Sequence, residues 1–217
     1  MNKILAIAAV ENSAQFKYIT LFLEEMNKKA KEKFIIQKVT VQFGIGDQFY
    51  VEHLNGTRSN RKIMSKLKDF WSSGIEIAPS KASIYYGFQT LCNETFEDGD
   101  KLLILVFDFR NNGSGFRGSD RNTIVNILTN KLAVENGQPL NIRYYAQFIY
   151  VNKNPSGDMS SSYAPLQSIK GENGRQANIG CYDILENSTK TDVEKIDSAS
   201  IRKLAHRTLK AFYEHTN

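Results

Sequence analysis

Two acidic residues stand at the ends of the two most apolar segments of the chain. Glu11 directly follows the run KILAIAAV (residues 3–10), and Asp108 lies near the end of the run KLLILVFDF (residues 101–109). Ser13 follows Glu11 closely. If both runs are neighbouring parallel strands, these three side chains converge at the carboxyl edge of the sheet, where ligands bind. Carboxylate and hydroxyl oxygens suit Mg²⁺ and Mn²⁺, so the pattern indicates a hard-cation site.

The same residues also have a purely structural interpretation. Ser13 is placed to cap a following helix, and Glu11 and Asp108 can simply be solvated where their strands end. The residue types alone do not decide between a cation site and this interpretation, so both stay open.

A loop rich in Gly and Asn follows Asp108. It runs from Arg110 to Ser119, includes Arg117, and precedes a predicted helix. Backbone N–H groups of a Gly-rich segment before a helix can bind an anion. The alternative, which we favour, is that Gly and Asn serve only to form turns. The loop lacks the Gly-x-x-x-x-Gly-Lys-Ser/Thr pattern of a nucleotide-binding P-loop.

Continuous apolar runs predict the strands that would position these residues. Such runs are typical of strands buried on both faces of a parallel sheet, and they occur at 3–10 and 101–109. Residues 34–43 and 142–151 are predicted to be further strands. Residues 48–54 alternate between apolar and polar side chains. We expect them to return antiparallel to 34–43 as an edge hairpin, because only a short link containing Gly joins the two segments.

Apolar residues at spacings of three and four predict the helices. Helices are expected after Ser13 and Ser59, from Asp120 and from Ser198, with a short helix at 84–94 and a loop at 74–83. Strands that alternate with such helices predict an α/β fold. We expect it to be three-layer and doubly wound, with a mostly parallel central sheet.

The 217 residues are expected to form one domain over 1–217. Residues 152–178 are polar and rich in Ser, Gly and Asn, which predicts a long loop or insertion. Residues 179–185 are predicted to be a short edge strand and residues 198–215 a C-terminal helix. The apolar run after Met1 is interpreted as a buried strand and not as a signal peptide.

Charge, hydropathy and cysteine content limit the kinds of partner and compartment that we expect. The net charge is +5 and the sequence pI about 9.1, but Lys and Arg are spread along the chain. We therefore expect a protein partner and not nucleic acid. No run approaches the roughly 20 apolar residues of a membrane helix, so no membrane association is expected. The chain has only 2 cysteines, Cys92 and Cys181, which favours a reduced, cytoplasmic protein.

The chain resembles the von Willebrand factor A family over residues 3–152. Three segments carry the resemblance: VTVQFGIGDQFYVEHLNGTRSNRKIMSKL, SIYYGFQTL and LLILVFDFRNN. They are similar to that family's second and third strands with the next helix, to its short helix after the metal-site loop, and to its central strand with a terminal Asp. The resemblance implies a Rossmann-like sheet and a metal-ion-dependent adhesion site, where a partner's carboxylate completes the shell of a divalent ion.

The implied site departs from the family pattern after the first strand. The family has Asp-x-Ser-x-Ser there. In this chain Glu11 stands for the Asp, Ser13 matches the first Ser, and Gln15 stands for the second Ser.

The remaining ligand positions match the family pattern only in part. The family's Thr position falls at Ala82, with Ser80 or Ser83 as substitutes, and Asp108 matches the final Asp. Because Mg²⁺ demands near-ideal octahedral geometry, the lost hydroxyls imply only weak binding of Mg²⁺ or Mn²⁺.

The sequence therefore predicts a protein-binding module of the von Willebrand A type and favours binding over catalysis. The alternative is a Rossmann-like metal-dependent hydrolase in which Glu11 and Asp108 hold a metal-activated water, although no general base or nucleophile stands out. The expected metal ligands are Glu11, Ser13, Asp108, Ser80 and Ser83. The expected partner-binding residues are Asn12, Arg110, Asn112 and Arg117.

Overall fold

The protein has an α/β fold built on one parallel sheet. The computed structural model describes residues 1–10, 13–43, 75–77, 88, 95–109, 118–130, 134–135, 138–139, 141–151, 163–185 and 196–217. Six strands form the sheet in the order β3-β2-β1-β4-β7-β8, and every pairing is parallel. The strands are β1 (Asn2–Val10), β2 (Ile35–Phe43), β3 (Ile75–Ile77), β4 (Lys101–Asp108), β7 (Arg143–Tyr150) and β8 (Ile179–Asp183).

The two most apolar strands lie side by side at the centre of the sheet. β1 and β4 pair in parallel from Asn2 with Lys101 to Ala9 with Asp108. All nine residues of β1 are buried, as are seven of the eight residues of β4. Burial on both faces requires apolar side chains at every position, which is why these strands lack polar alternation. The predicted adjacency of 3–10 and 102–108 is confirmed.

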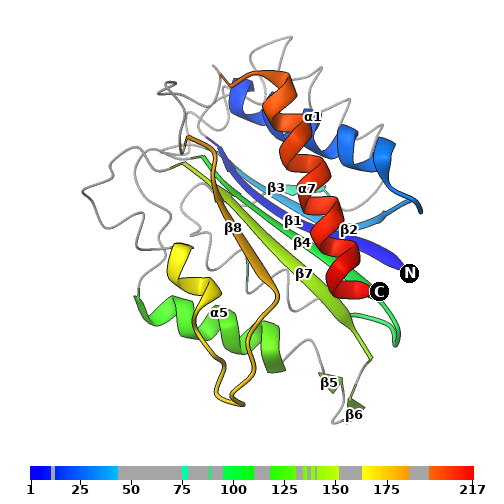
Figure 1. Ribbon diagram of the computed structural model, residues 1–217, viewed down its shortest axis with the longest axis vertical. Coiled ribbons are helices and arrows are strands. Elements are labelled where there is room, and N and C mark those ends of the chain that lie inside the picture. Colours follow the sequence, from blue (N-terminus) through cyan, green and yellow to red (C-terminus); the bar gives the residue numbers. More distant parts are fainter. Residues whose placement is uncertain are drawn as a thin grey trace.

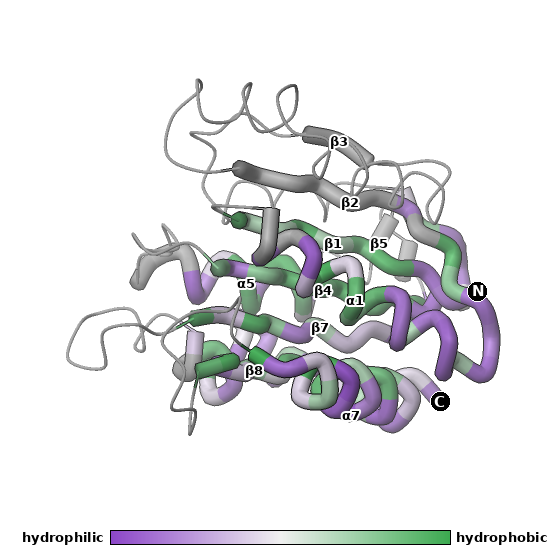
Figure 2. Tube along the Cα trace, turned by 90° about the horizontal axis from the view of Figure 1, so that it is seen from above, coloured by the Kyte–Doolittle hydropathy of each residue, from purple (hydrophilic) through white to green (hydrophobic). Residues whose placement is uncertain are grey.

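Helices cover both faces of the sheet (Figure 1). One face carries α1 (Ser13–Lys29) and α7 (Ser198–Thr216), and the other carries α5 (Gly118–Asn130) with the short η2 (Ala164–Gln167). Each face has its own buried apolar cluster, and the central strands β1 and β4 between them are mostly hydrophobic (Figure 2). The predicted three layers are therefore present.

The helices follow the predicted apolar spacing. Helix α7 buries apolar residues at spacings of three and four, which include Ile201, Leu204, Ala205, Leu209 and Phe212. It begins at Ser198 as expected, and the Asp197 side chain caps it by accepting the Ser200 N–H at 2.8 Å. Helix α5 begins at Gly118, ahead of the expected Asp120.

The predicted edge hairpin is not shown. The outer side of β2 pairs in parallel with β3 from Val39 to Val41, and β3 lies where a loop was expected at 74–83. Three residues are too few to show a periodicity that separates strand from loop. Residues 48–54 lie outside the described residues, as does nearly all of the expected helix at 84–94. A two-residue antiparallel pair, β5 (Val134–Glu135) with β6 (Gln138–Pro139), was not predicted.

The second half of the predicted loop at 152–178 is packed structure. Tyr163, Leu166 and Ala177 are buried in the cluster beneath α5. A bridge between Lys170 and Gln176 closes a turn in which Gly174 has a φ of +75°. The polar composition of this segment hid a few buried anchors, which attach its second half to the domain core. The expected edge strand after it is confirmed as β8.

Candidate functional site

The carboxyl ends of four strands form a row of side chains. Ala9 is paired with Asp108, Asp108 with Tyr150, and Tyr150 with Asp183. From the central strand β1, strands β2 and β3 extend the sheet to one side, and β4, β7 and β8 then extend it to the other side. Ligand sites of open α/β sheets lie where the strand order reverses, which here is between β1 and β4. Asp108 is the last residue of β4 and stands at that point.

Asp108 is held by a tyrosine from a distant segment. Its side chain is buried, with the residue only 2% exposed, and the Tyr163 hydroxyl donates to Asp108 Oδ2 at 2.5 Å. The Tyr163 ring stacks on Tyr150, with the ring centroids 4.6 Å apart and the planes 18° apart. The Tyr163 carbonyl also accepts from the Cys181 thiol, at 3.2 Å. Sequence reasoning missed Tyr163, because no pattern connects it with a strand 55 residues earlier.

A buried carboxylate needs such donors. Moving a charged group out of water costs several kcal/mol unless hydrogen bonds replace its hydration. A hydroxyl that donates to Asp108 stabilises the charged form, which is the form that binds a cation or a partner's donor. The second acid of the row, Asp183, accepts the Leu185 N–H at 3.0 Å and lies two strands away, at roughly 10 Å.

Most of the predicted site residues lie outside the described residues. These are Glu11, Asn12, Ser80, Ser83, Arg110, Asn112 and Arg117. Ser13 begins helix α1, directly after β1, although its side chain is not described. Asp108 is at the predicted edge. In the part of the chain that the structure describes, no three His, Cys, Asp or Glu side chains gather as a metal-ligand group.

Two other ionisable groups near this edge stay neutral. Tyr18 packs edge-on against Phe109 at 5.4 Å, and burial raises its pKa well above the ordinary value, with smaller effects of Tyr182 and Asp197 in the same direction. Burial also raises the pKa of the Cys181 thiol to about 12. The thiolate is the nucleophilic form, so Cys181 is unsuited to nucleophilic catalysis at neutral pH.

Comparison with known proteins identifies no family. No family model matches the chain, and no curated protein matches it. Within the described residues, no helix is both long enough and apolar enough to cross a membrane.

Proposed function

We propose that the protein is a protein-binding module of the von Willebrand A type, which docks its partner at the carboxyl edge of the sheet with the assistance of a divalent cation. The observation that carries this proposal is the position of Asp108. It ends a central strand next to β1, at the reversal of the strand order, where its side chain accepts a hydrogen bond from Tyr163.

The fold is consistent with the proposal in two further respects. Helix α1 begins at Ser13, so this residue lies within a few residues of the end of β1, as the resemblance requires. Helices cover both faces of a parallel sheet, which leaves the edges as the places where loops can meet a partner. The antiparallel edge strand expected with this family is the part of the resemblance that the described residues do not support.

Asp108 fits a role in cation binding. A carboxylate is the ligand type that Mg²⁺ and Mn²⁺ prefer, and the Tyr163 hydroxyl fixes one of its oxygens in place. Glu11, Ser13 and Ser80 or Ser83 would complete the protein's share of the shell. With two of the family's hydroxyl positions replaced by Gln15 and Ala82, a partner carboxylate is needed to raise the affinity.

A capture experiment from the native host tests the proposal. Wild type and Asp108→Asn are each immobilised and exposed to host extract in Mg²⁺ or in EDTA. We expect a specific protein to be retained by wild type in Mg²⁺, and to be lost in EDTA and with Asp108→Asn. Lys170→Ala, an exposed residue of the segment that precedes β8, serves as the surface control. Circular dichroism confirms that each variant is folded.

Two outcomes would overturn the proposal. Retention of the same partners by Asp108→Asn and in EDTA would place the docking surface elsewhere. Hydrolysis of a phosphate or carboxylic ester by wild type in Mn²⁺, lost in Asp108→Asn, would instead support the metal-dependent hydrolase, with Glu11 and Asp108 as its ligands.

A further inference from the structure

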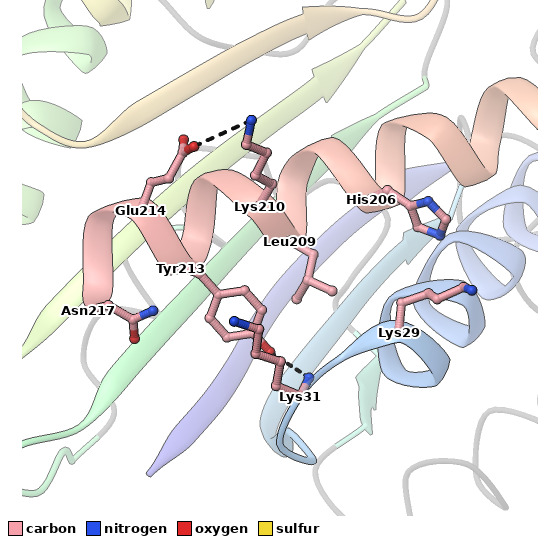
Figure 3. Close-up of a pocket in the computed structure, with 8 residues that line it drawn as sticks. All are labelled: Lys29, Lys31, His206, Leu209, Lys210, Tyr213, Glu214 and Asn217. Carbon is pink, nitrogen blue, oxygen red and sulfur yellow. Dashed lines mark hydrogen bonds and ion pairs between the residues drawn. The ribbon is translucent and has the colours of Figure 1, made fainter.

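The helical layer carries an open groove at the end of the sheet opposite to Asp108. It lies between α7 and the end of α1, with a volume of about 610 Å³ (Figure 3). Its lining includes Asn217, which accepts a hydrogen bond from Lys101 at the start of β4, at 2.9 Å. The groove is therefore at the amino edge, and the site around Asp108 does not share it.

Positive charge dominates this groove. Three lysines, Lys29, Lys31 and Lys210, and the imidazole of His206 line it with a single acid, Glu214. Glu214 lies 3.7 Å from Lys210, and both side chains are largely exposed, so this ion pair is weak.

The basic surface continues along α7. From Arg202 to Lys210, every exposed residue of the helix is basic, and these are Arg202, Lys203, His206, Arg207 and Lys210. The charge that is dispersed in the sequence is thus concentrated on one face. A surface of one sign attracts a partner of the opposite sign and speeds their encounter.

The floor of the groove is apolar. Leu209 is almost fully buried below it, and the Tyr213 ring forms the adjoining wall. The Tyr213 hydroxyl accepts the Lys31 N–H at 2.9 Å, and Lys31 Nζ lies 5.4 Å from the centre of the same ring. These contacts fix Tyr213 between the end of α1 and α7, so the groove is preformed.

We propose that this groove docks an acidic peptide segment of a partner protein, with carboxylates against Lys29, Lys31 and Lys210 and an apolar side chain against Leu209 and Tyr213. An apolar floor with a charged rim is the composition of a peptide site. The volume accommodates several side chains, whereas a single phosphate would leave most of the groove empty.

A labelled twelve-residue peptide of alternating Glu and Leu tests the proposal, with a Gln-for-Glu peptide and a single-stranded DNA of twelve nucleotides as comparisons. Binding is measured by fluorescence anisotropy at physiological salt. We expect the Glu peptide to bind at least ten times more tightly than the Gln peptide, and its affinity to fall as salt rises. The Lys29→Glu/Lys31→Glu variant should weaken binding at least tenfold.

The matched control reverses two charges on the other face of the sheet. Lys170 and Arg175 are both exposed there, so Lys170→Glu/Arg175→Glu changes the net charge equally and should leave peptide binding unchanged. Equal weakening by both double variants would mean that only the net charge matters and would overturn the proposal. Tighter binding of the DNA than of the Glu peptide would assign the surface to nucleic acid instead. Asp108→Asn should not alter peptide binding, which separates this groove from the proposed docking edge.

Discussion

At the scale of single residues, the hydrogen bond between Tyr163 and Asp108 connects a late segment with the central strand. The acceptor is a buried carboxylate, and hydrogen bonds to charged groups contribute more than those between neutral groups. Tyr145 offers a neutral comparison in the same sheet, because its hydroxyl donates to the Gln147 side chain at 2.9 Å and both residues are buried.

Tyr163→Phe should lower the free energy of unfolding by about 1.5–3 kcal/mol, because it leaves a buried charge without one of its donors. Tyr145→Phe should cost about 1 kcal/mol, as expected for a neutral pair. Urea denaturation of both variants measures the difference. Equal costs would show that Asp108 is not held as a charged group.

The contact between Glu25 and His206 makes the packing of α1 on α7 sensitive to pH. His206 Nε2 lies 2.9 Å from Glu25 Oε1, and Arg202 Nε lies 3.8 Å from Glu25 Oε2. The hydrogen bond with His206 lowers the pKa of Glu25 below its ordinary 4.5, against the opposing effect of burial, and nearby Lys28 and Arg202 lower it further. A carboxyl whose pKa is lower in the folded state than in the unfolded state stabilises the protein at pH values above its unfolded-state pKa. This stabilisation is lost as the pH falls through the folded-state pKa.

Glu25→Gln should therefore reduce the thermal midpoint at pH 7, and the gap to wild type should close as the pH falls below the ordinary carboxyl pKa of 4.5. Thermal melts from pH 7 to pH 3 measure this difference in midpoint between the variant and wild type. Glu24→Gln, one residue away and without a described contact to α7, is the control and should show a smaller gap. A gap that stays constant down to pH 3 would rule out the ionised form of Glu25 as the source of the stabilisation.

At the scale of elements, the edge strand β8 is fitted closely to β7. Gly180 is paired with Gln147, and a Cβ at Gly180 would meet the Tyr145 hydroxyl and lie 2.6 Å from Gln147 Oε1. Both neighbours are buried and bonded to each other, so neither can move away freely. A glycine is needed here because two side chains of β7 occupy the space that its own side chain would fill.

Gly180→Ala should lower the free energy of unfolding by about 1–3 kcal/mol, the usual cost of overpacking. The double variant Gly180→Ala/Tyr145→Phe removes the nearest obstructing oxygen. Its cost should be smaller than the sum of the two single costs, as measured by urea denaturation. Simple additivity would mean that the Tyr145 hydroxyl does not limit the space at this position.

At the scale of the whole molecule, the two proposed surfaces lie at opposite ends of the sheet. Asp108 ends β4 at the carboxyl edge, whereas the groove residue Asn217 contacts the first residue of β4. Both chain ends lie near the groove, since the Met1 carbonyl also accepts the Lys101 N–H at 2.9 Å. A partner at one edge therefore leaves the other edge accessible.

Mg²⁺ alone should stabilise the isolated protein very little. A ligand that binds only the folded state raises stability by RT ln(1 + [L]/Kd), which is small when the concentration is below Kd. We expect 5 mM Mg²⁺ to shift the thermal midpoint by less than about 1 °C relative to NaCl of equal ionic strength. A larger shift in wild type that is absent in Asp108→Asn would show that the protein's own ligands suffice and that no partner carboxylate is required.

Several elements could be predicted from strong local signals in the sequence. The runs at 3–10 and 101–109 predicted the two central strands, because burial on both faces leaves no position for a polar side chain. The spacing of Ile201, Leu204 and Phe212 predicted the buried face of α7, because residues at these spacings lie on the same side of a helix. The same signals predicted that Asp108 lies at the carboxyl edge of the sheet, where β4 ends.

The features that join distant segments became visible only in the folded protein. It brought Tyr163 onto Asp108, packed residues 163–178 beneath α5, paired β3 with β2 in parallel, and concentrated dispersed basic residues beside α7. Each of these depends on how elements are arranged in space. Periodicity records only which face of a single element is buried, so it determined the central strands and helices of this protein, but it could not specify which side chains meet across them.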